Sequence, residues 1–501
     1  RLDQTNLIIQ TAGKTQVAGK LQTSLPQTYF SPLTAHFDKH VENEYQDFYA
    51  ERGIPRLLSK EGPKVAVGDL NGDGLADLYI GGARGTIGQV YMQTTDGSFI
   101  KKVEPAFQPF SSFEDVAVLF FDYDHDGTLD LLVCPGGNTT PVNTFELQFR
   151  LFKNDGKGNF TLVNGAFPHN EMNISVAIAN DVNGDGYPDL FIGSRSVPGN
   201  YGKDPQSYLF INDGTGHFTD IASTKIPALS HLGMVTGAVW ADVLGNSSSS
   251  SKTKQLVIVG EWMTPHIFTI TGNSGTENKT NLSNLSGWWQ SIATADLNHT
   301  GRQDLILGNI GENFYLKPDA VNPVKLWLND FDKNDDPDKI ITYTYQGKDI
   351  PVLLKHDLEE QLPMIKKNNL KHQQYASKSI QELFTPELIN SSTVKVFNYP
   401  SSCIAYNKGN GNFKLVKLPP ESQFSCINEI LPQFERLDGS FGDILINRGN
   451  DQFKPVKANK TGLSLKGEMR DIQAVNTKKG WVYIFLQNNE FPELYKLNST
   501  R

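Results

Sequence analysis

A nine-residue pattern that occurs three times constrains the fold of this chain more than any other feature. Oxygen-bearing side chains stand at positions 1, 3, 5 and 9, and glycine stands at position 6. A hard cation such as Ca²⁺ binds six to eight oxygens, and a short loop can wrap it only where glycine allows a sharp turn. Carboxylates packed this closely repel one another without a cation. The three copies read Asp69-Leu-Asn71-Gly-Asp73-Gly-Leu75-Ala-Asp77, Asp122-Tyr-Asp124-His-Asp126-Gly-Thr128-Leu-Asp130 and Asp181-Val-Asn183-Gly-Asp185-Gly-Tyr187-Pro-Asp189.

The pattern predicts three calcium loops, in which the backbone carbonyl at position 7 (Leu75, Thr128 or Tyr187) adds a ligand. An EF-hand is excluded, because it needs a glutamate at position 12 and flanking helices. Position 12 is Ile80, Val133 or Ile192, and short apolar runs flank each loop. Such runs indicate strands, so each loop joins two strands of a hairpin. The alternative is an ordinary Asp/Asn/Gly turn that holds no metal.

The loops mark a repeat. Their first residue recurs as Asp69, Asp122, Asp181, Asp242 and Asp296, and two further abbreviated units follow. A second hairpin, such as Asn154-Asp-Gly-Lys-Gly158, closes several units, and this composition is a strong turn signal. Inner strands are expected to begin near residues 65, 116, 176, 237, 291, 427 and 470. Seven four-stranded units predict an all-β, seven-bladed β-propeller. Two separate β-domains, divided at a helical insertion, are the alternative.

Not every unit keeps the metal pattern. Unit four has Asp242 followed by a surface loop with five serines, Ser247–Ser251. Unit five keeps Asp296, Asn298 and Asp304, but Thr300 stands at position 5, so we expect weak binding or none. The same unit contains a further Asp-rich stretch in which Asp335 replaces the glycine. It offers a candidate fourth calcium site at Asp330, Asp332, Asn334, Asp336 (through its carbonyl) and Asp338.

We divide the chain into a lead-in segment, residues 1–60, and the repeat region, residues 61–501. Residues 352–390 break the β pattern and predict two or three short helices inserted into unit five. A propeller ring is usually closed by a strand from one terminus, and we expect residues 6–10 or 494–497 to supply it.

Composition limits the function classes. The net charge is −9 and there is no basic run, which argues against nucleic-acid binding. No run of eighteen apolar residues predicts a membrane-spanning helix. Three cysteines, Cys134, Cys403 and Cys426, form no disulfide framework or metal motif, although Cys403 and Cys426 could pair. Weak structural calcium sites would stay empty in the cytosol, so the loops favour an exported protein.

The repeat units resemble FG-GAP/VCBS repeats, the calcium-loop blades also found in integrin α-chain heads. Across residues 60–497 the chain resembles more closely the large VCBS-repeat surface proteins of Bacteroidetes-type bacteria, which pair such propellers with an ASPIC/UnbV segment. The resemblance rests on the Val65–Leu78 stretch, on Val259-Gly-Glu-Trp-Met, on Gly287-Trp-Trp-Gln-Ser-Ile and on the helical insertion. Residues 1–20 resemble the end of an ASPIC/UnbV segment, which implies that the chain is the C-terminal part of a longer one.

The resemblance implies an exported outer-membrane protein, often lipid-anchored and encoded beside SusC/SusD-type, TonB-dependent importers. The sequence shows no GxSxG, HExxH or P-loop motif, so we predict no catalytic or organic-cofactor residue and expect a binding scaffold. The scaffold would contact other surface proteins through the helical insertion. Five tryptophans could bind a glycan or peptide or could fill gaps between blades: Trp240, Trp262, Trp288, Trp289 and Trp327. The alternative is a polysaccharide lyase or another glycan-active enzyme, with Arg84, Arg195 or Lys203 as the base.

Overall fold

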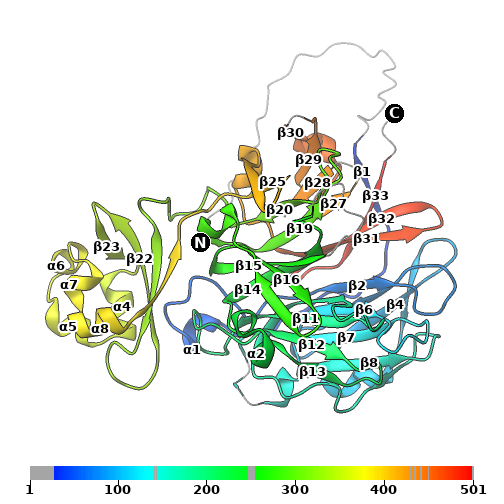
Figure 1. The fold of residues 1–501 in the computed structure, drawn as a ribbon, viewed down its shortest axis with the longest axis horizontal. Coiled ribbons are helices and arrows are strands. Elements are labelled where there is room, and N and C mark those ends of the chain that lie inside the picture. Colours follow the sequence, from blue (N-terminus) through cyan, green and yellow to red (C-terminus); the bar gives the residue numbers. More distant parts are fainter. Residues whose placement is uncertain are drawn as a thin grey trace, which may run out of the picture.

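Seven antiparallel sheets form a closed ring (Figure 1). The structure is a computed structural model and describes residues 28–498 apart from 140, 143, 246–253, 429, 434–435, 440–442 and 450. The innermost strands contact one another in turn from β2 through β6, β10, β14, β19 and β27 to β31, and β31 contacts β2. The predicted seven-bladed propeller is confirmed.

Each of the first four blades is built from consecutive strands. Blade one contains β2 (Val65–Gly68), β3 (Asp77–Ile80), β4 (Gln89–Gln93) and β5 (Phe99–Lys102). Blade two contains β6 (Asp115–Phe121), β7 (Asp130–Pro135), β8 (Arg150–Asn154) and β9 (Phe160–Leu162). Blade three contains β10 (Asn173–Asn180), β11 (Asp189–Ser196), β12 (Tyr208–Asn212) and β13 (Phe218–Asp220). Blade four contains β14 (Met234–Ala241), β15 (Gln255–Met263), β16 (His266–Thr271) and β17 (Ser274–Glu277), with β18 (Gly287–Trp288) paired to β15.

Of the last three blades, blade six follows this simple order, whereas blades five and seven depart from it. Blade five contains β19 (Ser291–Ala295), β20 (Asp304–Gly308), β25 (Cys403–Gly409) and β26 (Asn412–Lys417). Blade six contains β27 (Leu431–Gln433), β28 (Arg436–Gly439), β29 (Asp443–Asn447) and β30 (Phe453–Pro455). Blade seven contains β31 (Met469–Thr477), β32 (Gly480–Gln487) and β33 (Glu493–Leu497), and its outer strand is β1 (Phe30–Leu33).

A strand from the start of the described chain therefore closes the ring. β1 pairs with β33, with Phe30 opposite Leu497 and Leu33 opposite Leu494. Of the two segments expected to provide closure, residues 494–497 lie in β33 and residues 6–10 lie outside the described residues. The partner of β33 comes from the lead-in segment, which had given no clear strand pattern at this point.

The insertion in blade five is larger than the sequence predicted. Between β20 and β25 the chain forms an eighth sheet, in the order β23 (Lys348–Pro351), β22 (Asp338–Tyr345), β21 (Val324–Asn329) and β24 (Thr393–Phe397). The expected two or three helices are five: α4 (Lys355–Gln361), α5 (Met364–Asn368), α6 (His372–Ala376), α7 (Ile380–Leu383) and α8 (Pro386–Ser391). This insert, residues 309–402, stands out to the left of the ring in Figure 1. The sequence pattern had hidden the extra sheet, because β21 and β22 flank an Asp-rich loop just as blade strands do.

Apolar side chains fill the spaces between neighbouring blades. One cluster joins blades two and three through Leu132, Leu190 and Phe210, each of which has no exposed surface. The second strands β7, β11 and β15 are buried along their whole length. Most of their side chains are apolar, and buried Arg195 of β11 pairs with buried Glu261 of β15. A separate cluster holds the insert's helices on its sheet, with Ile340, Leu358 and Ile365 at its centre.

The segment that follows β1 crosses the end of the ring at which the inner strands begin. It contains α1 (Asp47–Ala50), and Ile54 and Leu58 pack against Trp262 and Trp288 together with residues of the insert. Buried Glu51 pairs with Lys339 of the insert at 3.0 Å. The Asp loops follow the other ends of the inner strands, so the segment and the blade loops lie at opposite ends of the ring.

The remaining helices are short connections: α2 (Ala222–Lys225), α3 (Pro227–Ser230), α9 (Ala458–Thr461) and the 3₁₀ turns η1 (Pro105–Phe110), η2 (Phe145–Leu147), η3 (Asn281–Asn284) and η4 (Pro420–Gln423). Among the residues with described placement, no helix is both long and apolar enough to cross a lipid bilayer.

Candidate metal centres

Five Asp loops adopt the same hairpin geometry, and the four complete candidate sites are among them. In each loop the residue before position 1 pairs with position 9, as in Gly68 with Asp77 and Asn329 with Asp338. The same pairing frames the loops at 122–130, 181–189 and 296–304. The insert therefore carries a loop of the blade type on a sheet outside the ring.

The left-handed backbone at positions 4 and 6 gives the loops their tight turn. Position 6 is glycine in the four blade loops, with φ between 78° and 95° at Gly74, Gly127, Gly186 and Gly301. In the insert Asp335 takes the same conformation, with φ of 68°. An aspartate tolerates this region better than most residues do, so the missing glycine does not change the shape of the loop.

The carboxylates at positions 1 and 9 organise each loop. In the first loop, Asp69 accepts hydrogen bonds from the amides of Gly72 and Gly74, each at 2.8 Å. Asp77 accepts one from the amide of Leu70 at 3.0 Å and one from Gln93, in the third strand, at 2.8 Å. The position 9 contacts recur in the other blade loops, where the third-strand donors are Asn154, Asn212 and Asn407. The insert replaces that amide with the side chain of Gln361, 3.0 Å from Asp338.

Position 9 is the buried end of each loop. Asp77, Asp130 and Asp189 have no exposed surface. Burial raises the pKa of Asp77 to about 6, of Asp130 to about 7 and of Asp189 to about 6, although backbone amides oppose the shift. A carboxylate that is costly to ionise in this way is stabilised in its charged form by a nearby cation.

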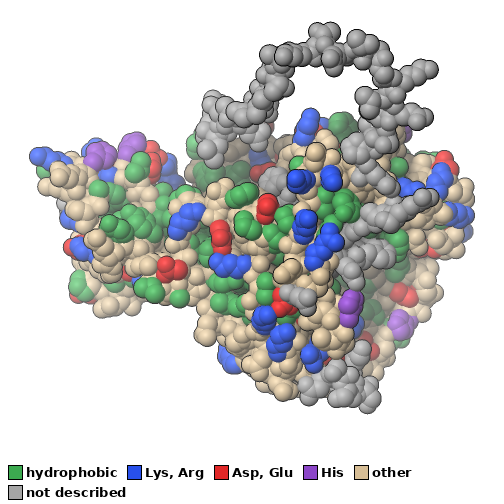
Figure 2. Space-filling view, turned by 90° about the horizontal axis from the view of Figure 1, so that it is seen from above, with side chains coloured by type: hydrophobic (Ala, Val, Ile, Leu, Met, Phe, Trp, Pro, Cys, Tyr) green, Lys and Arg blue, Asp and Glu red, His purple; other side chains and the backbone are tan. Residues whose placement is uncertain are grey.

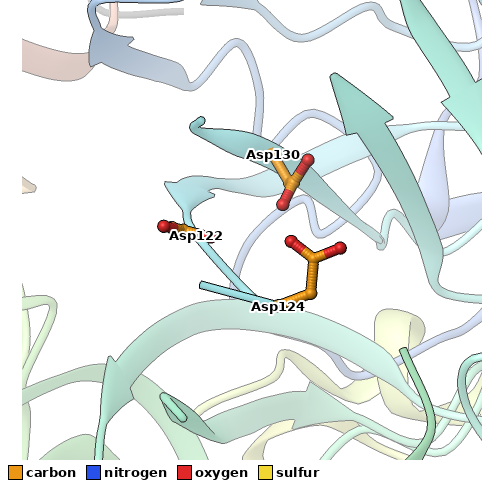
Figure 3. A group of neighbouring side chains, drawn as sticks. All are labelled: Asp122, Asp124 and Asp130. Atoms are coloured by element: carbon orange, nitrogen blue, oxygen red, sulfur yellow. The ribbon is translucent and has the colours of Figure 1, made fainter. Parts of the chain in front are cut away.

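Two loops bring three carboxylates together. One oxygen each of Asp122, Asp124 and Asp130 lies within 4.8 Å of the others, and the same holds for Asp330, Asp332 and Asp338. Figure 3 shows the side chains of Asp124 and Asp130 pointing toward each other, with Asp122 beside them. These are the two loops with aspartate at position 3. Both triads could bind a metal ion.

Lys153 supplies a positive charge to the second loop. This lysine of β8 contacts Asp124, and its Nζ lies 2.9 Å from Asp126. The lysine side chain is 39% exposed, so it can move into solvent when a metal ion takes its place. The ammonium group shows where the loop most favours positive charge.

Asparagine stands at position 3 in the first and third loops. Asn71 donates to Asp73 at 3.1 Å, and Asn183 donates to Asp185 at 2.7 Å. An amide oxygen is an ordinary calcium ligand, and every side chain expected to bind the metal in the four complete loops offers it an oxygen atom. The residues therefore fit a hard cation, with Leu75, Thr128, Tyr187 and Asp336 at the positions expected to offer a backbone carbonyl.

The two degraded loops keep hydrogen bonds to their first aspartate. Asp296 still accepts the amides of Thr300 and Gly301, so this loop keeps its shape with only two carboxylates. In blade four, Asp242 accepts the amide of Gly245, and the serine run lies outside the described residues.

Side chains that the sequence had not singled out connect these loops to neighbouring blades. Asn212, which ends the third strand of blade three, donates to the carbonyl of Tyr123 in the loop of blade two at 2.8 Å and to its own Pro188 at 3.1 Å. Its oxygen accepts the amide of Gly214 at 2.9 Å. Equivalent contacts to position 2 of the preceding loop join Asn154 to Leu70, Asn407 to Val243 and Asn447 to Leu297, and the Gly272 amide does the same to Val182. The sequence signal for these contacts is the asparagine two residues before the glycine of each turn, as in Asn212-Asp-Gly and Asn447-Arg-Gly.

The remaining candidates occupy structural positions. Trp262, Trp288, Trp289 and Trp327 are at most 6% exposed and pack in cores, whereas Trp240 is half-buried. Arg195 is buried in an ion pair with Glu261, and Arg84 donates to the carbonyl of Thr139. Lys203 borders a groove beside the insert. No disulfide joins Cys403 to Cys426 in the described structure.

Comparison with known proteins agrees with the loop geometry. A family model described as an FG-GAP-like repeat matches residues 69–133 and 181–247, which span the three complete blade loops. The chain carries FG-GAP-like repeats. No curated protein matches this chain significantly.

Solved structures also align with this FG-GAP-like propeller at low identity. The BBS1N–ARL6DN complex soaked with mercury gives a TM-score of 0.43 at 9% identity, covering 95% of this chain and 99% of that one. YCF48 bound to D1 peptide gives 0.43 at 8%, covering 95% and 98%. Chaetomium thermophilum Sqt1, bound to the N-terminus of ribosomal protein L10, gives 0.41 at 10%, covering 89% and 98%. With these TM-scores below 0.5, the fold assignment rests on the sheets themselves.

Proposed function

We propose that this protein is a non-catalytic binding scaffold, stabilised by calcium, that docks a partner protein through the insert. The insert carries the proposal, because it departs from the repeat and presents large apolar side chains to solvent. Leu370 is 82% exposed, Leu354 72% and Tyr345 59%. Insertions into repeat proteins are common contact sites, and exposed apolar groups beside polar ones favour protein recognition.

The insert is held against the ring. Lys339 pairs with buried Glu51, Lys395 pairs with Asp204, and Leu326 lies in one apolar cluster with Tyr201 and Trp288. Figure 2 shows it standing out to one side, with hydrophobic side chains among charged ones on its surface. A pre-ordered surface loses little conformational entropy when a partner binds, which favours its use in recognition.

Calcium is the ion that suits the loops. The four complete sites, at residues 69–77, 122–130, 181–189 and 330–338, offer only carboxylate, amide and carbonyl oxygens in short loops. Ca²⁺ accepts such irregular sets, whereas Mg²⁺ demands near-octahedral geometry and zinc prefers nitrogen and sulfur ligands. Bound calcium would neutralise the carboxylates and tie the ends of each hairpin together.

The resemblance to bacterial VCBS-repeat surface proteins extends this proposal. It supports an exported location at the outer membrane, anchored through a region outside this chain, with a SusC/SusD-type nutrient importer as the partner. Extracellular calcium concentrations are high enough to fill weak structural sites, which agrees with such a location.

Co-purification from native membranes tests the docking surface. We expect the protein to recover the same importer component repeatedly and the Tyr345→Ser/Leu370→Ser variant to lose it. The Ile100→Ser/Val103→Ser variant is the matched control, because these two side chains are also exposed, at 61% and 75%, but lie on or beside blade one. Equal recovery by both variants would exclude the insert as the docking surface, and the absence of any specific partner would contradict the scaffold itself.

A further inference from the structure

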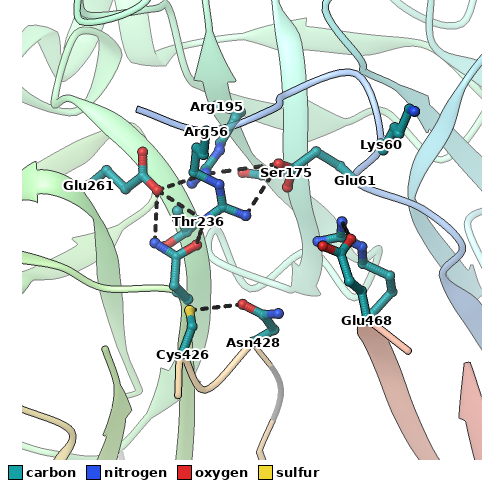
Figure 4. Close-up of polar contacts among 12 residues, drawn as sticks. Arg56, Lys60, Glu61, Ser175, Arg195, Thr236, Glu261, Cys426, Asn428 and Glu468 are labelled. Atoms are coloured by element: carbon teal, nitrogen blue, oxygen red, sulfur yellow. Dashed lines mark hydrogen bonds and ion pairs between the residues drawn. The ribbon is translucent and has the colours of Figure 1, made fainter. Parts of the chain in front are cut away.

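A polar cavity lies on the ring axis, at the end where the inner strands begin. About 40 Å³ of it is open to the centres of water-sized molecules, and Ser175, Thr236 and Asn428 contribute to its wall. Four cationic side chains, Arg56, Lys64, Arg195 and Arg470, line it, and Glu61 is the one carboxylate among its described lining residues. Figure 4 shows Arg56 and Arg195 side by side, with Glu61 facing them from the N-terminal segment.

Glu261 lies beside the cavity, and four hydrogen bonds already occupy its carboxylate oxygens. It has no exposed surface and accepts hydrogen bonds from Arg195 at 2.9 Å, Arg56 at 3.2 Å, Gln290 at 2.8 Å and Tyr201 at 2.9 Å. This carboxylate fixes one edge of the two guanidinium groups. The Nη2 atoms of both arginines also face Glu61.

The remaining donors of the cavity are incompletely used. Arg195 is 2% exposed, and its Nε has no hydrogen-bond partner among the described residues. Arg470 bonds Glu468 at 2.6 Å through Nη2, while its Nε has none there either. Glu61 Oε1 lies 3.7 Å from Arg56 and 3.9 Å from Arg195, too far for a hydrogen bond.

Buried donors of this kind are costly to leave unsatisfied, and the described residues of the lining carry more positive than negative charge. Three guanidinium groups act on the Glu61 carboxylate. Burial raises the pKa of Glu61, but the charges of Arg195, Arg56 and Arg470 outweigh burial and hold this pKa below its usual range. At these distances the Glu61 carboxylate does not satisfy the N–H donors that surround it.

We propose that this axial cavity binds a small oxyanion between Arg195, Arg470 and Arg56. Guanidinium groups bind sulfate, phosphate and carboxylate oxygens through paired N–H donors. The bound oxyanion would satisfy Arg195 Nε and balance the cationic lining. Because Arg56 comes from the N-terminal segment, Arg195 from blade three and Arg470 from blade seven, the oxyanion would also join that segment to two blades across the ring axis.

Thermal unfolding and calorimetry with inorganic sulfate, inorganic phosphate and acetate test the proposal. Low-millimolar sulfate or phosphate should raise the melting temperature, relative to sodium chloride of equal ionic strength, and acetate shows whether a carboxylate suffices. Arg195→Gln and Arg470→Gln should each abolish the shift. If Arg195→Gln does not fold, Arg470→Gln carries the test. Arg52→Gln is the control, because that arginine is exposed and pairs with Glu360 outside the cavity.

Glu61→Gln gives a result of opposite sign. Removing the Glu61 carboxylate should strengthen oxyanion binding about tenfold, because a repelling charge a few ångströms away is lost. Oxyanion binding that is unchanged in Arg470→Gln, or absent from the wild-type protein, would overturn the proposal. A Glu61→Gln variant that binds no more tightly than wild type would also contradict it.

Discussion

At the residue scale, Lys153 competes with calcium for the second loop. Its ammonium group contacts Asp124 and lies 2.9 Å from Asp126. Lys153→Met should therefore raise the calcium affinity of this loop about five- to tenfold, since one Coulomb contact of this kind is worth about 1 kcal/mol near water. Calorimetric titration would measure it. Lys157→Met, which removes an exposed lysine from the adjacent hairpin, should leave the affinity unchanged.

Asn212 tests the contact between blades. It is 1% exposed and connects its own hairpin to the loop of blade two. Asn212→Ala should cost about 2–4 kcal/mol, because it leaves two buried carbonyls and an amide without their partner. Urea unfolding would measure the loss. Asn159→Ala removes an exposed asparagine of the neighbouring blade, and an equal loss there would show that Asn212 has no special role.

Glu42 gives a prediction of pH dependence. Burial raises its pKa from 4.5 to about 7, and its side chain has no exposed surface. The folded protein thus holds this proton more tightly than the unfolded chain does, so stability is lost as the pH rises from about 4.5 to 7. Glu42→Gln should remove up to about 3 kcal/mol of that loss. Melting temperatures of the wild type and the variant, measured across this pH range, would check the prediction. Parallel curves for the two proteins would contradict it.

At the element scale, the strand β1 closes the ring. Phe30 is 2% exposed and packs on Tyr483 and Phe485, with ring centroids 5.4 and 6.5 Å apart. Phe30→Ala should cost about 3–5 kcal/mol and lower the unfolding midpoint of the whole ring. Leu33→Ala on the same strand, at 37% exposure, should cost far less. Similar small effects of both changes would mean that β1 does not hold the ring closed.

The blades could be predicted from the sequence because each loop sits at a fixed place between two apolar strands. The loop at 69–77, for example, determines where β2 ends and β3 begins. The sheet of the insert could not be separated from a blade, because β21, its Asp loop and β22 repeat the same local pattern. What distinguishes them is pairing over a distance: β20 pairs with β25, across the whole insert.

In the candidate metal sites, too, some features follow from local sequence and others depend on distant segments. The oxygen ligands follow from local spacing, and even Asp335 in place of glycine changes little, because it adopts the same left-handed backbone. The contact from Asn212 to Tyr123 and the cluster around Arg195 depend on segments that the ring brings together. Local patterns carry no information about such contacts.

At the scale of the whole molecule, calcium and the closed ring should act together. Position 2 of a loop accepts a hydrogen bond from the next blade, so an ordered loop also orders the interface. Ligand binding to the folded state alone adds to its stability, by about 2.7 kcal/mol when free calcium is a hundred times the dissociation constant. Several loops filled together should make this effect large.

The most direct test is the melting temperature of the intact chain with calcium and with a chelator. We expect EGTA to lower the midpoint by many degrees and added Ca²⁺ to restore it, with about four ions bound per chain. Replacing Asp124 and Asp332 by alanine should reduce both the number of ions and the shift. Identical melting curves in calcium and in chelator would contradict a calcium-stabilised propeller.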